Sequence, residues 1–311
     1  MQLPKRFQNK IAESRRILPL MVVYALAVWV AAELVSRQLY VQLACFAVCA
    51  YLMVELNNSN SLIRIYSRMV SCSFLALTSM STFLFPSFRA ALVTLCFISF
   101  YTILFHTYQD RQSPGFTFYA FFALGIASVM FPQVVFFVIP LWLMMAFWLM
   151  ALTPRMFFAS LLGLVAPYWF IVPYYFYVGL QHRFIPHAHS IITFRPLFPH
   201  PLPNLHLLLS FAFVLILGIV GTVHFLRQSS KDKIRTRMLF SVIITMFWLT
   251  TLFIILQPQH FETLFGFMTV NASVLIGHFI ALTHTRFTNF AFKLMIIAVL
   301  ALTAYNLWMP S

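Results

Sequence analysis

The chain has 311 residues, of which 62% are hydrophobic and only 8% charged, and its formal net charge is +14 at pH 7. A soluble domain is about half apolar and a quarter charged, so this composition excludes an ordinary soluble fold and predicts an all-α, polytopic membrane protein. The apolar runs continue for about twenty residues instead of alternating over about ten, which excludes a transmembrane β-barrel.

About eleven membrane spans follow one another along the chain. Residues 1–16 form a basic amphipathic lead without the cleavage site of a signal peptide. Residues 17–311 are predicted to form a single transmembrane domain. Its spans are expected at residues 17–35, 39–56, a stretch ending near residue 85, 90–108, 116–131, 134–152, 157–178, 205–226, 238–256, 267–283 and 290–308.

The basic residues are distributed unevenly over the loops of this topology. Of the 20 Lys and Arg residues, all but Arg37, Arg89, Arg183 and Arg195 fall on the side of the N-terminus. By the positive-inside rule, the N-terminus is cytoplasmic and the C-terminus extracytoplasmic. The positive charge therefore indicates orientation in a bacterial inner membrane, with the lipid bilayer and other membrane proteins as partners and no nucleic acid.

Several kinds of chemistry have no matching motif in the chain. The four cysteines lie inside predicted spans and form no CxxC motif, so we expect them to pack as small apolar side chains. There is no phosphate-cradling glycine loop and no nucleophile elbow, and the longest cytoplasmic loop, residues 227–237, is too short to form a catalytic domain. These features exclude ATP hydrolysis within this chain, and the sequence leaves the cofactor unknown.

A hairpin in the middle of the chain resembles a known family. Residues 121–132, with the sequence FFALGIASVMFP, are followed by an apolar run to Trp148. This pattern resembles the glycine-then-proline hairpin of a family of uncharacterised, Bacteroidota-type multi-pass inner-membrane proteins of unknown function. The agreement covers residues 55–178 and includes these short motifs: Asn57-Asn58, Leu62-Ile63, Phe85-Pro86, Leu161 to Leu164, Pro167-Tyr168 and Tyr174-Tyr175.

The same hairpin is more remotely similar to the GT-C superfamily of polyprenyl-phosphate-dependent glycosyltransferases. This resemblance implies a GT-C-like arrangement with a cytoplasmic N-terminus, an acidic residue near the first outer loop, and a longer outer loop between the seventh and eighth spans. The segment at residues 179–204 is the longest outer loop of this chain.

Six basic side chains lie in that outer loop: His182, Arg183, His187, His189, Arg195 and His200. Such a cationic patch suits the phosphate of a polyprenyl-phosphate lipid, because arginine can grip phosphate oxygens with two hydrogen bonds. The alternative is a solvated connector whose basic residues touch lipid headgroups. The loop contains no Cys, Asp or Glu, so a metal ion would need an all-histidine site, and we predict none.

Two of the six carboxylates, Glu33 and Glu262, are expected on the outer side. Glu33 is placed in the last turn of the first span, before a loop of only three residues, and Arg37 follows it by four positions. It is a functional candidate or one half of a structural ion pair. The GT-C resemblance implies that Glu33 removes the proton of an acceptor hydroxyl while Arg183 or Arg195 holds the leaving phosphate. Glu262 is the second catalytic candidate or a surface residue.

Asn271, Ser273 and His278 lie on one predicted span, where they bond neighbouring helices or line a path for protons or solutes. Three functions remain open. The chain is a GT-C-like glycosyltransferase of cell-envelope biogenesis or a degenerate relative, a non-catalytic membrane subunit or scaffold of an envelope assembly, or a transporter or flippase.

Overall fold

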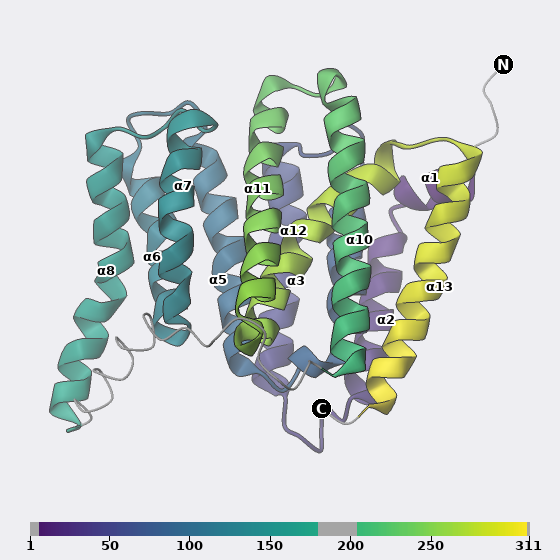
Figure 1. Cartoon of the computed structure of the whole chain (residues 1–311), viewed down its shortest axis with the longest axis horizontal. Helices are drawn as coiled ribbons and strands as arrows, with labels where there is room; N and C mark the ends of the chain where they lie inside the picture. The colour runs from purple at the N-terminus through teal and green to yellow at the C-terminus, as the bar shows by residue number, and fades with distance from the viewer. Residues whose placement is uncertain (1–5, 180–203, 310–311) are drawn as a thin grey trace. The chain divides into compact units, whose positions relative to one another are not determined.

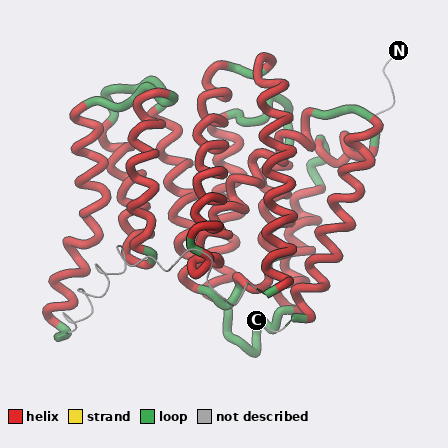
Figure 2. Tube along the Cα trace, viewed as in Figure 1, coloured by secondary structure: helices red, strands yellow, loops and turns green. Residues whose placement is uncertain are grey.

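The chain is helical, without a strand, throughout the part that the computed structural model describes, residues 6–179 and 204–309 (Figure 2). It separates into two compact units, which comprise residues 1–91 with 201–311 and residues 92–200. Among the residues that the structure describes, seven helices are long and apolar enough to cross a membrane. These observations confirm the predicted class of helical membrane protein.

The first unit, called unit 1, contains two helical groups from the two ends of the chain (Figure 1). Its α-helices are α1 (Phe7–Ala12), α2 (Ile17–Ala31), α3 (Tyr40–Asn60), α4 (Met69–Met80), α10 (Leu205–Gln228), α11 (Ile234–Leu256), α12 (Phe261–Leu282) and α13 (Arg286–Trp308). Short 3-10 turns, η1 (Thr82–Leu84), η5 (Ser229–Lys231) and η6 (Pro258–His260), lie between some of them.

Helix α12 is the centre of unit 1. Every residue of it except Glu262 is buried, and α1, α4, α10 and α11 pack around it. Glycines allow this close packing: a Cβ at Gly277 would lie 2.9 Å from the Val70 backbone on α4, and a Cβ at Gly221 on α10 would lie 2.7 Å from the Leu275 backbone. Small residues bring helix backbones together in this way in membrane proteins, where no hydrophobic force favours helix contact over lipid contact.

The amphipathic lead docks on the C-terminal end of α12. The last carbonyl groups of a helix have no partner within the helix, and two amide side chains of α1 supply donors to this region. Gln8 Nε2 donates to the Ile280 carbonyl oxygen at 2.7 Å, and Asn9 Nδ2 donates to that of Thr283 at 3.0 Å. Because Ser67 Oγ also donates to the Ala12 carbonyl, the turn at 61–68 joins the same end of the unit. We call this end the α1 end.

The second unit, called unit 2, contains most of α5 (Phe88–Leu104), followed by η2 (Phe105–Thr107), α6 (Pro114–Met130), η3 (Pro132–Val134), α7 (Val135–Phe147) and α8 (Pro154–Tyr177). Helices α6 and α8 touch at two glycines. A Cβ at Gly163 would lie 2.4 Å from the Phe118 carbonyl oxygen, and one at Gly125 would lie 2.6 Å from that of Leu164. The glycine of the hairpin motif, Gly125, thus lies at a close contact with α8, which follows the hairpin in the chain.

Each of the eleven predicted spans overlaps an α-helix, from α2 to α13. Seven of these helices reach spanning length, and four others, α2, α4, α6 and α7, are shorter apolar helices of 10–17 residues, with η3 extending α7. Eleven crossings therefore stay a prediction. One boundary was wrong in a way that matters: the first span was expected to reach Val35, but α2 ends at Ala31 and turns occupy residues 32–39.

Candidate functional site

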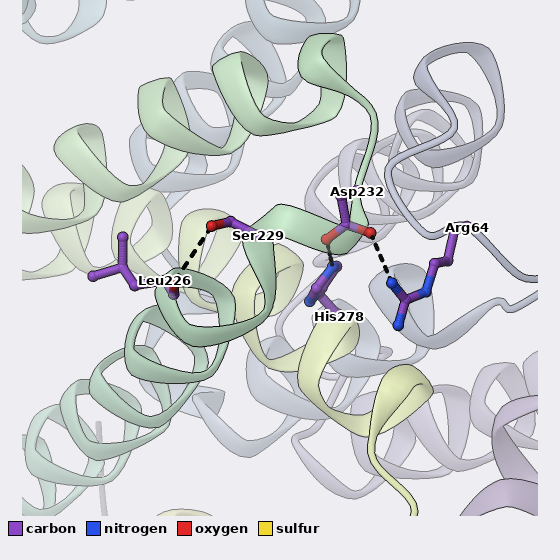
Figure 3. Close-up of polar contacts among 5 residues, drawn as sticks. All are labelled: Arg64, Leu226, Ser229, Asp232 and His278. Carbon is purple, nitrogen blue, oxygen red and sulfur yellow. Dashed lines mark hydrogen bonds and ion pairs between the residues drawn. The ribbon is translucent and has the colours of Figure 1, made fainter.

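A buried cluster of charged and titratable side chains lies at the α1 end of unit 1 (Figure 3). The His278 ring on α12 donates from Nε2 to Asp232 Oδ2 at 3.2 Å, and Arg64 Nη1 lies 3.6 Å from Asp232 Oδ1. The Asp232 side chain is 2% exposed and that of His278 is 0%, whereas the Arg64 side chain is 36% exposed. Asp232 thus bridges a buried imidazole and a guanidinium that reaches water.

Local backbone geometry turns Asp232 toward α12. Helix α10 continues into η5, where Ser229 Oγ donates to the Leu226 carbonyl oxygen at 3.2 Å (Figure 3). The Asp232 N–H then donates to the Ser229 carbonyl at 3.1 Å. Asp232 itself is extended, with ψ of 155°, so the chain leaves the turn toward α11 while the carboxylate faces inward.

Two opposing effects act on the Asp232 carboxyl. Burial raises its pKa, but the hydrogen bond and charge of His278, together with the charge of Arg64, outweigh burial and leave the pKa below the ordinary value. Asp232 is therefore a carboxylate at neutral pH. The negative charge is compensated on both oxygens, as a buried charge requires.

Aromatic rings surround the imidazole of His278. Its ring centroid lies 4.9 Å from that of Phe240, 5.3 Å from that of Phe225 and 5.5 Å from that of His224. Among the described residues, neither His278 Nδ1 nor His224 Nε2 has a hydrogen-bond partner. Chemically, the cluster places an imidazole N–H against a carboxylate. Mechanically, it ties the turns at 61–68 and 229–233 to the central helix.

The sequence did not predict this cluster. Asp232 was one of the four carboxylates not expected on the outer side, and His278 was grouped with Asn271 and Ser273 on one predicted span. In the structure Asn271 Nδ2 donates to the Phe267 carbonyl within its own helix. One feature of the sequence could have indicated the contact. An acidic residue stands inside a basic loop, and a histidine lies at the end of a span on the same side.

The opposite end of unit 1 contains Glu33, the predicted catalytic acid, in a turn that ends α2. The Leu34 N–H donates to the Trp29 carbonyl at 3.2 Å and the Glu33 N–H donates to that of Val30 at 3.2 Å. With φ of 62° at Glu33, these bonds form a Schellman motif, in which the left-handed residue is usually glycine. The apolar contact that accompanies the motif is also present, because Leu34 and Trp29 share one core cluster.

A second motif of the same kind follows at once. Gln38 has φ of 53°, the Leu39 N–H donates to the Leu34 carbonyl at 3.1 Å, and the Gln38 N–H donates to that of Val35 at 3.3 Å. Glu33 therefore does not lie in the last helical turn, and the first loop is longer than the three residues expected. The chain needs two left-handed residues to reverse direction here, and neither is a glycine, so the sequence alone did not reveal the turn.

Glu33 pairs with Arg37 as the spacing predicted. Arg37 Nε donates to Glu33 Oε2 at 2.9 Å, and both side chains are exposed, by 59% for Glu33 and 43% for Arg37. A pocket of about 160 Å³ lies beside the pair. Its polar walls come from Glu33, Arg37, Thr82 and Asn306, and Trp308 at the end of α13 adds an aromatic ring.

The other predicted site residues divide into two groups. Glu262 lies in the first turn of α12, ahead of the span expected at residues 267–283, and it is exposed. The six basic residues of the outer loop, His182, Arg183, His187, His189, Arg195 and His200, lie outside the described residues. Comparison of the chain with family models, with curated proteins and with solved structures finds no match.

Proposed function

We propose that this chain is a multi-pass protein of a bacterial inner membrane whose α1 end faces the cytoplasm. Two groups of charges in unit 1 support this orientation. Thirteen described basic residues lie at or next to the α1 end: Arg6, Lys10, Arg15, Arg16, Arg64, Arg68, Arg227, Lys231, Lys233, Arg235, Arg237, Arg286 and Lys293. At the opposite end, the Glu33 turn carries Arg37. Cytoplasmic loops collect Lys and Arg in this way.

We further propose that the protein acts in cell-envelope biogenesis with a polyprenyl-phosphate sugar, as a GT-C-like glycosyltransferase or a degenerate relative, and that the Glu33 pocket receives the sugar. The observation that carries this proposal is that Glu33, and not a glycine, occupies a backbone position with a left-handed conformation. A residue other than glycine costs roughly 1–2 kcal/mol there. An exposed ion pair such as Glu33–Arg37 contributes only about 0–1 kcal/mol, so structure alone does not favour Glu33 over glycine.

The residues around the pocket suit such a ligand. A sugar ring presents hydroxyl groups that the Glu33 carboxylate and the Arg37 guanidinium can bond, and an apolar face that can pack against Trp308. In transfer, the oxygen of the acceptor hydroxyl forms the new glycosidic bond to the sugar. Glu33 accepts the proton that this hydroxyl loses. The bond from the sugar to the lipid phosphate breaks, and the phosphate leaves with the bonding electrons. The predicted partners of that phosphate are Arg183 and Arg195.

The experiment measures donor binding and sugar release separately. The full chain is placed in lipid nanodiscs with radiolabelled polyprenyl-phosphate glucose or the mannose equivalent. We expect wild type to retain one donor and release its sugar, to water or to a hydroxyl acceptor. Glu33→Gln should still bind the donor but lose at least about a hundredfold in release. Glu13→Gln, at the α1 end, is the matched control, and Glu262→Gln tests the second candidate acid.

A non-catalytic membrane subunit is the second candidate, and the Glu33–Arg37 ion pair favours it because the pair gives Glu33 a structural partner. Under this alternative, Glu33→Gly relieves the backbone strain and removes only the exposed ion pair with Arg37. Donor binding without sugar release in wild type would support a degenerate relative. Absence of both would contradict the sugar proposal and leave the subunit as the explanation.

A further inference from the structure

A second cavity in unit 1, distinct from the Glu33 pocket, is an apolar groove between α2 and α13. Its volume is about 370 Å³, within the range of small-molecule sites. The floor is formed by α4, which contributes Met69, Cys72, Ser73, Ala76 and Leu77. Side chains of α2, α10, α12 and α13 complete the walls, and they are apolar apart from the Tyr24 hydroxyl.

The two ends of the groove are closed in different ways. Toward the Glu33 end, the Tyr24 hydroxyl on α2 and the Thr303 hydroxyl on α13 are 2.7 Å apart, so the two helices are joined there. Toward the α1 end, Phe7 and Ile11 of α1 form part of the wall. The long side opens outward, because its edge residues Leu20 and Leu300 are 64% and 51% exposed.

Cationic side chains lie around the α1 end of this groove. Lys293 Nζ on α13 lies 5.9 Å from the centroid of the Phe7 ring. Lys10 follows Phe7 on α1, and Arg16 directly precedes the first lining residue of α2. The side chains of all three residues are exposed. Glu13 is the acidic residue of this segment, so positive charge exceeds negative charge at this rim.

We propose that the groove binds one acyl chain of an anionic phospholipid, whose phosphate headgroup lies among Lys10, Arg16 and Lys293. Along α13 the groove extends from Phe292 to Leu300, about 12 Å at 1.5 Å per residue. One leaflet of a bilayer has a hydrocarbon depth of about 15 Å, half of the roughly 30 Å core. The groove therefore matches the depth of a chain whose headgroup is at the α1 end.

The rim charges, and not the apolar walls, decide which lipid is bound. An acyl chain that enters the groove exchanges contacts with other acyl chains for contacts with the walls, which are equally apolar. Burial of the acyl chain therefore gives little preference for one lipid over another. Each Lys or Arg near a membrane surface attracts an anionic headgroup by an amount that corresponds to about a fivefold change in affinity. This proposal is independent of the sugar-transfer proposal, which concerns the opposite end of unit 1.

The test uses the full chain in vesicles of phosphatidylcholine that contain spin-labelled phosphatidylglycerol or spin-labelled phosphatidylcholine. Electron spin resonance measures the lipid immobilised on the protein. Wild type should immobilise phosphatidylglycerol in preference. In K10Q/K293Q this preference should fall by about an order of magnitude or more. K231Q/K233Q is the matched control, because it removes the same charge from the same end of the unit but away from the groove.

A second variant separates the groove from the charged surface. Ala76→Phe places a ring in the floor of the groove, and Ala76→Leu is a milder substitute if the phenylalanine variant does not fold. Either should reduce the immobilised fraction of both labelled lipids. Equal immobilisation of the two lipids by wild type, or equal effects of K10Q/K293Q and K231Q/K233Q, would overturn the proposal. An unchanged immobilised fraction in a folded Ala76 variant would do the same.

Discussion

Replacing Asp232 by alanine gives the sharpest test of the buried cluster. The substitution removes the carboxylate that accepts from His278 Nε2 and faces Arg64. It leaves a fully buried imidazole without its hydrogen-bond acceptor and a guanidinium without its counterion. Three parts of unit 1, α12 and the turns at 61–68 and 229–233, then lose their common contact.

The expected loss of stability follows from the exposure of the three partners. Breaking a buried ion pair by removing one member costs about 3–5 kcal/mol. The Arg64 side chain is 36% exposed and can be solvated, so we expect the lower end of that range for Asp232→Ala, about 3 kcal/mol. Asp232→Asn keeps an oxygen that can accept from His278 and should cost about half as much, near the value of a single hydrogen bond to a charged group, about 1.5 kcal/mol.

The free energy of unfolding can be measured in mixed micelles with an increasing fraction of denaturing detergent. Glu262→Ala serves as the control, because Glu262 is an exposed acid in the first turn of α12 and its removal should cost less than about 1 kcal/mol. If Asp232→Ala costs no more than Glu262→Ala, the cluster does not hold the α1 end together and the argument from burial is wrong.

Three further substitutions or conditions test the packing and electrostatics. Gly163→Ala in unit 2 should cost about 2 kcal/mol or more, because its Cβ meets the Phe118 carbonyl; Gly115→Ala, with nothing within 4 Å, should stay within about 0.5 kcal/mol in the same unfolding assay. Gln8→Ala removes a hydrogen-bond donor to the end of α12 and should lower the free energy of unfolding by about 1–3 kcal/mol. Hydrogen exchange in the last turn of α12 should become faster. The pKa of Asp232 is lowered in the folded protein, so its ionised carboxylate stabilises the fold fully above about pH 4, the ordinary pKa of an Asp. This stabilisation is lost as the pH falls through the pKa of the folded state. The difference in free energy of unfolding between wild type and Asp232→Asn should therefore narrow only in acid.

Hydropathy predicted the helices well and their ends less well. Every expected apolar segment overlaps a helix, because backbone groups in lipid must be bonded within the segment. The end of α2 was missed because a C-terminal Schellman motif is normally recognised by glycine, and the chain has Glu33 and Gln38 at the two left-handed positions. Only the backbone bonds of the turn reveal the motif.

The site residues show a different limit of sequence analysis. The Glu33–Arg37 pair is local, four residues apart, and its spacing predicted it. The Asp232–His278 pair joins residues 46 positions apart, from a basic loop and an apolar helix. No periodicity links such positions, so their contact depends on how α10, α11 and α12 pack.

Hydropathy also does not distinguish the central helix from the outermost one. Helices α12 and α13 both pass as candidate spans, yet α12 is buried along almost its whole length and most of α13 faces outward. In lipid, an apolar side chain gains little by facing protein instead of acyl chains, so apolar content says little about position. Polar content is more informative: α12 contains Thr269, Asn271, Ser273 and His278, all fully buried. Thr269, Asn271 and Ser273 donate to carbonyl groups of α12 itself. His278 instead bonds Asp232, outside the helix, so it is the polar residue of this set that requires α12 to be surrounded by protein.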